Sequence, residues 1–317
     1  MLVNGQWERK WDPIQNKDSE GRFIRQSSAF THRIDDAQAA VNKGLRLYVA
    51  YICPWATRTL IARSLLNLED VIDVKIVEPV LTDFGWQFGG KSDSTPGSTE
   101  SGIDSVEYAH HLYTMTDDQY TGRATVPILW DSGDNKIINN ESADILHILN
   151  EDLRPVHHSD INLYPVEMMS QIDEFNASIY DSLNNGVYRA GFASSQKAYD
   201  EAIVDIFARL EELEAHFANN DFAVGNQLTE SDIRLFVTLV RFDVAYHGLF
   251  KTNIKAISDY PALSAYLDRL LQIEAFAKNT RVDHIKAGYY SITALNPSRI
   301  VPQGPHRDWF KYLPEGV

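Results

Sequence analysis

The spacing of hydrophobic and polar positions changes near residue 160. Before that point, short apolar runs such as LRLYVAYI at 45–52 alternate with segments in which apolar residues have the spacing of a helix, as at 54–68. After it, apolar positions recur every three or four residues, which is typical of amphipathic helices. The pattern therefore predicts a small α/β domain followed by a helical bundle.

The first half is expected to form a buried strand, a helix, a second strand, a loop, two more strands and a helix. Pro54 suits the first turn of its helix, because the missing N–H has no intrahelical partner there. Asn140 or its neighbour is expected to cap the last helix, and Glu141 favours its positive end. The expected ranges are, in order, 45–52, 54–68, 71–80, 82–102 for the loop rich in Gly, Ser, Thr and Asp, 124–130, 135–139 and 140–151.

The second half is predicted to be helical, with helices at 168–186, 196–220, 229–250 and 260–273. Thr229 and Asp232 have the spacing of a capping box, with Asp in the place of the usual Glu or Gln. The tail is Pro-rich and aromatic, and we expect it to pack on the core. The predicted division is an N-terminal extension at 1–44, an α/β domain at 45–155, a helical domain at 160–280 and the tail at 281–317.

Composition narrows the class of protein. The chain of 317 residues is long enough for two domains, and its formal net charge of −15 argues against a nucleic-acid binder. It contains no run of about 18 apolar residues, so no membrane span is expected. Cys53 is the single cysteine, which excludes an intrachain disulfide framework and favours a reducing, cytoplasmic compartment.

Cys53 lies where the first strand is expected to turn into a helix. A thiol at a helix start meets the helix dipole and free backbone N–H groups, and both favour the thiolate and lower its pKa. Ala56 stands where a thioredoxin-type C-x-x-C motif has its second thiol. A single thiol needs an external thiol to resolve a mixed disulfide, and glutathione is the cytoplasmic supply. A buried, inert cysteine is the alternative interpretation.

Two later motifs fit a glutathione site. Val126 precedes Pro127, and in thioredoxin-like domains such a proline is often cis and exposes the preceding backbone to a peptide ligand. Glu141 and Ser142 begin a predicted helix, where N–H groups can hold a carboxylate and Glu an ammonium group. Each motif alone is also compatible with an ordinary turn or helix cap. Their order after Cys53 makes them informative together.

Several strings in the chain together resemble one family, the Xi class of cysteine-type glutathione transferases, which are glutathionyl-hydroquinone reductases. The resemblance implies a thioredoxin-like N-terminal domain, an all-α C-terminal bundle and a homodimer. The strings are YICPWATRTLI at 51–61, DFGWQF at 83–88, YTGRATVPILWD at 120–131, INNESADI at 138–145, NNGVYRAGFA at 184–193, RFDVAYHGLFKTN at 241–253 and NPSRIVPQGP at 296–305.

The resemblance also implies a reaction. The Cys53 thiolate would attack the sulfur of a glutathionyl-hydroquinone and release the hydroquinone, and a second glutathione would resolve the mixed disulfide. No metal is expected. The glutathione contacts that the resemblance implies are Trp86, Arg123, Val126, Glu141 and Ser142.

Three tyrosines are implied on the quinone side, Tyr188, Tyr246 and Tyr289. Phenolic donors near the leaving ring would hold its oxygens and help to protonate it. One position departs from the family pattern, because Gly288 stands where a histidine is expected. The sequence therefore assigns Tyr289 a smaller role than the other two.

Two other functions stay open at this point. An omega-like thioltransferase or dehydroascorbate reductase would use the same Cys53 chemistry on another acceptor, and the tail and tyrosine strings argue against it. A non-catalytic protein that binds aromatic ligands would not need a cysteine at a helix start. The expected partners are thus glutathione and glutathionylated aromatic substrates.

Overall fold

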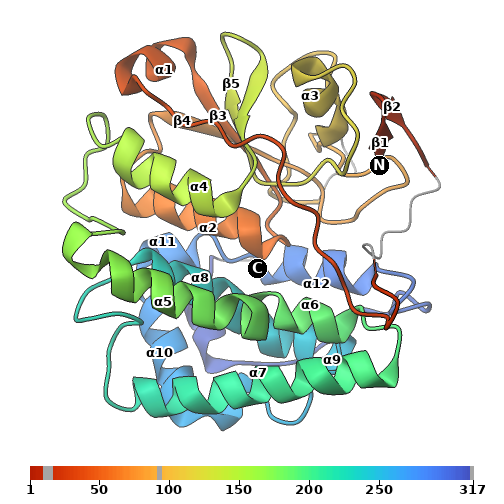
Figure 1. Cartoon of the computed structure of the whole chain (residues 1–317), viewed down its shortest axis with the longest axis vertical. Helices are drawn as coiled ribbons and strands as arrows, with labels where there is room; N and C mark the ends of the chain where they lie inside the picture. The colour runs from red at the N-terminus through yellow and green to blue at the C-terminus, as the bar shows by residue number, and fades with distance from the viewer. Residues whose placement is uncertain (10–16, 91–94, 315–317) are drawn as a thin grey trace. The chain divides into compact units, whose positions relative to one another are not determined.

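The computed structural model describes residues 1–9, 17–90 and 95–314, which form two compact units (Figure 1). One unit holds the described residues of 1–9 and 27–161, and the other holds those of 17–26 and 162–314. The expected N-terminal extension is thus divided, and residues 17–26 belong to the helical unit. We call the first the α/β unit and the second the helical unit.

A four-stranded sheet forms the centre of the α/β unit, with the strand order β4-β3-β5-β6. Strand β3 (Leu45–Val49) pairs in parallel with β4 (Ile72–Ile76) and antiparallel with β5 (Ile128–Asp131). Strand β6 (Lys136–Asn139) pairs antiparallel with β5 at the edge. Leu47 in the middle of β3 is completely buried, as expected for the central strand of a covered sheet.

Several strands are shorter than the sequence predicts, and the one expected at 71–80 is limited to Ile72–Ile76. The expected strand at 45–52 ends at Val49, because the Cys53 N–H donates to the Ala50 carbonyl at 3.0 Å in a turn that leads into the next helix. The expected strand at 124–130 begins only at Ile128. Pro127 precedes it and has no N–H to donate to a neighbouring strand.

Helices α2 (Pro54–Leu65) and α4 (Ser142–His147) contact each other in the α/β unit and lie side by side in Figure 1. Pro54 occupies the first helical position, as predicted. Helix α4 is shorter than the expected 140–151, because the chain continues as a π-helical turn at Ile148–Asp152. Its cap is Glu141, whose side chain accepts from the Ala143 N–H.

Four short elements of the α/β unit were not predicted. The hairpin of β1 (Leu2–Val3) and β2 (Gln6–Trp7) has strands of two residues, too short to show a period. Helix α1 (Ala37–Lys43) is capped by the Asp36 side chain, and α3 (Ala109–Thr116) has no side-chain cap.

The expected loop at 82–102 contains no helix or strand among its described residues, and 91–94 lie outside the described part of the chain. Isolated bridges hold it instead, between Thr82 and Gly85 and between Gln87 and Tyr108.

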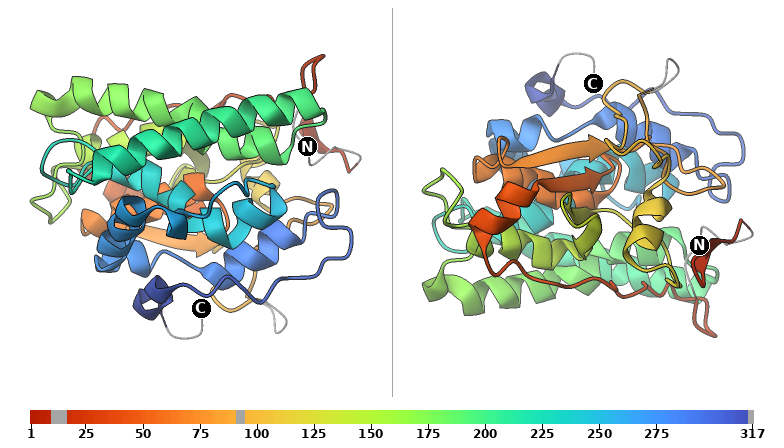
Figure 2. Two further views of the ribbon diagram at one scale, coloured as in Figure 1. Left: turned by 90° about the horizontal axis from the view of Figure 1, so that it is seen from below. Right: turned by 90° about the horizontal axis from the view of Figure 1, so that it is seen from above.

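The helical unit consists of helices and connecting segments. Figure 2 shows the long helix α7 running beside α6, in agreement with their contacts. None of the helices in the described residues combines the length and apolarity that crossing a bilayer requires. The longer members are α5 (Met169–Ile179), α6 (Gly186–Gly191), α7 (Gln196–Phe217), α8 (Glu230–Arg241) and α10 (Pro261–Leu271), and the short ones are α9 (His247–Leu249) and α11 (Glu274–Ala277).

Two predicted helices are interrupted by π-helical turns. The expected helix at 168–186 changes at Tyr180–Asn184, and that at 229–250 changes at Phe242–Tyr246. Turns of this kind are frequent at functional sites. The predicted capping box is present, because the Thr229 N–H donates to the Asp232 carboxylate at 2.9 Å.

The tail at 281–317 contains both a helix and a short 3₁₀ turn. It begins with helix α12 (Val282–Tyr290), which carries Tyr289. A 3₁₀ turn follows at Asp308–Tyr312, and its Trp309 is buried. Residues 315–317 of the expected tail lie outside the described residues.

Candidate functional site

Cys53 is the N-cap residue of α2 and has extended backbone angles. Its side chain makes no capping hydrogen bond, so the thiol is not used to hold the helix. The backbone is fixed instead by its carbonyl, which accepts from both the N–H and the hydroxyl of Thr57 at 3.0 Å. The thiol forms no disulfide and is half-buried. A fixed backbone with a thiol that does not cap its own helix suits a nucleophile.

The Val126–Pro127 segment lies against this thiol. The Cys53 Sγ is 3.5 Å from the Val126 carbonyl oxygen, to which the protonated thiol donates. The Val126–Pro127 peptide bond is cis, as the thioredoxin-like pattern predicts. Two motifs separated by 73 residues in the chain therefore meet at one place.

The carboxylate of Glu141 lies at the start of α4. Its Oε1 accepts from the Ala143 N–H at 3.2 Å and from the Ser142 hydroxyl at 3.5 Å. Its Oε2 accepts from the Ser28 hydroxyl at 2.8 Å. Since a carboxylate has about four lone-pair sites, Glu141 retains room for one further donor such as an ammonium group.

A residue that the sequence analysis did not single out links these loops. The hydroxyl of Tyr113 on α3 donates to the Thr125 carbonyl at 2.9 Å and accepts from the Thr125 N–H at 3.1 Å and the Asn140 amide at 2.9 Å. Thr125 precedes Val126, and Asn140 precedes Glu141. Burial raises the pKa of Tyr113, so the hydroxyl stays protonated. Tyr113 therefore fixes both loops at once.

Replacing Tyr113 with Phe is expected to lower the stability of the α/β unit by about 1–3 kcal/mol, because it leaves buried backbone and amide groups of the two loops without a partner. We also expect weaker glutathione binding, since both loops lose a common anchor. Thermal unfolding and calorimetric titration with glutathione measure the two effects.

Tyr199→Phe is the matched control, because its hydroxyl donates to the Lys251 carbonyl in the helical unit. Glutathione affinity that is unchanged in Tyr113→Phe would mean that the two loops do not hold glutathione.

Trp86 and Arg123, the other two residues assigned to glutathione, lie on loops of the same unit, and both are half-buried. The Trp86 carbonyl accepts from the Ala109 N–H at 2.9 Å, which ties its loop to the start of α3. Trp7 covers the same loop and donates from its ring to the Asp83 carbonyl at 2.9 Å. Gly85 has a positive φ of 84° and lies under the Trp7 ring, so a side chain there would be strained and would meet the ring.

The three predicted tyrosines meet in the helical unit. The hydroxyls of Tyr188 and Tyr289 are 2.6 Å apart, and those of Tyr246 and Tyr289 are 3.1 Å apart. Tyr188 comes from α6, Tyr246 from the π-helical turn after α8 and Tyr289 from α12. We call these three residues the tyrosine cluster.

Aromatic packing holds the tyrosine cluster in place. The Phe250 ring lies 5.2–5.6 Å from the ring centres of all three tyrosines. Gly191 lets α6 approach Phe250, because a Cβ at that position would overlap the ring. Tyr246 is completely buried, and Tyr289 is 3% exposed. Burial raises the pKa of both phenols well above the ordinary value near 10, so both remain protonated at physiological pH.

Tyr289, to which the sequence assigned a smaller role, belongs to the tyrosine cluster. Its hydroxyl contacts the hydroxyls of both other tyrosines. The neighbouring Gly288 is buried in α12, and its carbonyl accepts from the Ser291 hydroxyl at 2.7 Å. The absence of a histidine side chain at 288 therefore does not displace Tyr289 from the other two tyrosines.

No group of three or more His, Cys, Asp or Glu side chains in the described ranges is arranged to hold a metal ion. The residues assigned to glutathione all belong to the α/β unit, and the tyrosine cluster belongs to the helical unit.

Comparison with known proteins connects these features to a family. The model of the glutathione S-transferase N-terminal domain matches residues 52–152, and that of the C-terminal domain matches residues 196–269. The glutathionyl-hydroquinone reductase PcpF of Sphingobium chlorophenolicum is 43% identical over 306 residues, which cover 96% of each chain. The chain belongs to the glutathione S-transferase family, in its Xi class.

Two further relatives agree with this membership of the Xi class. The glutathionyl-hydroquinone reductase YqjG of Escherichia coli is 40% identical, over 97% of this chain and 96% of that protein. Its glutathione-bound structure has a TM-score of 0.84. The Xi glutathione S-transferase of Phanerochaete chrysosporium has a TM-score of 0.87 at 39% identity, over 92% of this chain and 97% of that chain. The expected family and the expected combination of a thioredoxin-like with a helical domain are both confirmed.

Proposed function

We propose that this Xi-class transferase reduces glutathionyl-hydroquinones to hydroquinones with glutathione, through Cys53. The observation that carries the proposal is the position of the single thiol at the start of α2, where it does not cap the helix and lies 3.5 Å from the Val126 carbonyl. The names of PcpF and YqjG support the same substrate class.

The reaction has two exchange steps. The Cys53 thiolate attacks the sulfur of the conjugate, a sulfur–sulfur bond forms and the bond between sulfur and the aromatic carbon breaks. The electron pair remains on that carbon, which takes a proton to give the hydroquinone. A glutathione thiolate then attacks the glutathione sulfur of the mixed disulfide, which produces glutathione disulfide and regenerates the Cys53 thiolate.

Glutathione is proposed to bind on the α/β unit. The Val126 backbone, close to the thiol, suits pairing with the peptide. The ammonium group of the γ-glutamyl end is assigned to Glu141 and its carboxylate to Ser142. Arg123 would pair with the glycyl carboxylate, and Trp86 would cover the peptide.

Glu141→Gln is expected to weaken glutathione binding by about 1.5–3 kcal/mol, because the neutral amide keeps an oxygen for the Ala143 N–H but loses the charge that faces the ammonium group. Glu141→Ala also removes the helix cap, which costs about 1 kcal/mol of stability. Calorimetric titration measures the affinity, and thermal unfolding separates the two effects. An unchanged affinity in Glu141→Gln would place the γ-glutamyl end elsewhere.

The tyrosine cluster is proposed to serve the aromatic ring. Tyr246 and Tyr289 are protonated phenols, so they are donors to the ring oxygens or to the departing carbon. The support is that three hydroxyls meet at one place: the Tyr289 hydroxyl lies 2.6 Å from that of Tyr188 and 3.1 Å from that of Tyr246. We further propose that the protein is a homodimer that uses glutathione as co-substrate and no metal, as the Xi-class resemblance implies. A cytoplasmic location is proposed because the chain has a single cysteine.

The decisive assay of this function uses glutathionyl-benzohydroquinone and free glutathione. We expect one free hydroquinone and one glutathione disulfide for each conjugate consumed. Hydroxyethyl disulfide and dehydroascorbate, assayed in parallel, test the omega-like alternative. Turnover of those two acceptors without turnover of the conjugate would establish the alternative, and binding of aromatic ligands without any turnover would establish a non-catalytic protein.

A further inference from the structure

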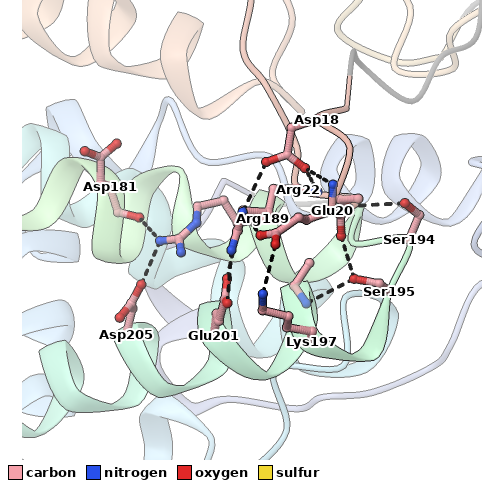
Figure 3. A network of polar contacts seen from close by, with 12 residues as sticks. Asp18, Glu20, Arg22, Asp181, Arg189, Ser194, Ser195, Lys197, Glu201 and Asp205 are labelled. Carbon is pink, nitrogen blue, oxygen red and sulfur yellow. Dashed lines mark hydrogen bonds and ion pairs between the residues drawn. The ribbon is translucent and has the colours of Figure 1, made fainter.

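Residues 17–25, which we call the strap, are held on the helical unit by ion pairs (Figure 3). Arg22 makes a two-pronged contact with Glu201 on α7, at 2.8 and 3.1 Å. Glu20 accepts from Lys197 on the same helix at 3.0 Å. Single exposed ion pairs contribute little, but a network with bidentate arginine geometry fixes position well.

Backbone contacts fix the register of the strap. The Ser195 hydroxyl donates to the Glu20 carbonyl at 2.8 Å, and the Ser194 N–H donates to the Gly21 carbonyl at 3.2 Å. Figure 3 shows these serines beside the strap, just before α7 begins. These contacts therefore fix where the residues after Arg22 lie on the helical unit.

The strap delivers two side chains to the tyrosine cluster. Phe23 is 8% exposed, and its ring stacks on those of Tyr188 and Phe192 at 6.3 and 6.1 Å. The Arg25 guanidinium lies 5.4 Å from the centre of the Tyr188 ring, within the range of a cation–π contact. A segment far from Tyr188 in the sequence is thus part of the wall around it.

Arg25 is held in place by a neutral partner. Its Nε donates to the Asn185 side-chain oxygen at 2.8 Å, one turn before Tyr188. This bond orients the guanidinium. Burial is the largest influence on the pKa of Tyr246 and Tyr289 and raises it, and the buried Arg241 opposes that rise. Arg25 therefore brings a positive charge beside the Tyr188 ring.

We propose that Arg25 determines specificity for acidic acceptors: its guanidinium pairs with a carboxylate on the aromatic ring of the conjugate held at the tyrosine cluster. The proposal rests on the proposed function, because it assigns the aromatic ring to this cluster. A planar guanidinium matches a carboxylate in two parallel hydrogen bonds, which a lysine does not reproduce. The strap thereby sets the substrate class through one positioned charge.

The test compares two conjugates that differ in one charge, a glutathionyl-hydroquinone with a ring carboxylate and its methyl ester. We expect the wild-type protein to prefer the carboxylate, and Arg25→Met to lower kcat/KM for it about tenfold or more while changing that for the ester about twofold or less. Arg25→Lys should restore part of the preference. Arg189→Met is the matched control, because Arg189 lies on α6 and pairs with Asp205.

Equal losses on both conjugates, or a preference for the carboxylate that survives in Arg25→Met, would overturn the proposal. If the wild-type protein turns over neither conjugate, the proposed function fails, and binding still tests Arg25. Calorimetric titration with dihydroxybenzoate and with hydroquinone should then show that Arg25→Met selectively loses affinity for the former. Equal affinities of the wild-type protein for both compounds would overturn the role of Arg25.

Discussion

Cys53→Ser is expected to abolish reduction of glutathionyl-hydroquinones, with turnover falling by a factor of about 10³ or more. A serine hydroxyl keeps the size and the capping position of the thiol at the start of α2 but is not ionised and does not form a mixed disulfide. Cys53→Ala should behave in the same way. Steady-state release of hydroquinone measures the loss for the conjugate, and formation of glutathione disulfide measures it for small disulfides.

Glutathione binding provides the control for the cysteine variants. Because Cys53 makes no capping hydrogen bond, either substitution leaves the helix start intact, and calorimetry should show nearly unchanged glutathione affinity. A Cys53→Ala protein that retains most of its activity would contradict the mechanism, since no second cysteine exists to replace it.

Phe substitutions in the tyrosine cluster should separate acceptor chemistry from thiol chemistry. Tyr188→Phe and Tyr246→Phe are each expected to lower turnover of glutathionyl-hydroquinones about tenfold or more, because an aromatic carbon leaves poorly without a proton donor. Tyr289→Phe should cost at least as much, since its hydroxyl contacts both others. Parallel assays with hydroxyethyl disulfide should show small changes, because a thiolate leaves without such help.

The pH dependence of turnover gives a second test of the tyrosine cluster. Burial raises the pKa of Tyr246 and Tyr289 well above 10, so both stay neutral donors and their ionisation does not limit the rate between pH 6 and about 9. Equal losses on the conjugate and on the disulfide would mean that the tyrosines support the fold or glutathione binding and not the acceptor step.

Local patterns in the sequence predicted those features whose causes are local. Pro54 marks the start of α2, and the spacing of Thr229 and Asp232 marks the start of α8. The position of Cys53 at the helix start follows from the strand before it and the proline after it. Each of these depends on residues within a few positions of one another, where periodicity and capping rules operate.

Features that depend on distant contacts were not predicted. Helix α3 is short and has no side-chain cap, so its Tyr113 gave no signal of its link to Thr125 and Asn140. Arg22 and Glu201 pair across 179 residues, and no local pattern shows that the strap belongs to the helical unit.

The tyrosine cluster was anticipated only through resemblance to a family, because Tyr188 and Tyr289 are 101 residues apart. Its internal order was not anticipated. The neighbouring Gly288 suggested a lesser role for Tyr289, but it gave no sign that the Tyr289 hydroxyl contacts those of Tyr188 and Tyr246. A substitution next to a residue in the sequence thus says little about contacts that come from other helices.

The most direct test of the account is a single turnover without free glutathione. Wild-type protein mixed with an equal amount of glutathionyl-benzohydroquinone should release one hydroquinone per chain, and mass spectrometry should find one glutathione on the Cys53 peptide. Adding glutathione should then remove that adduct as glutathione disulfide. Release of hydroquinone while Cys53 remains unmodified would contradict the account.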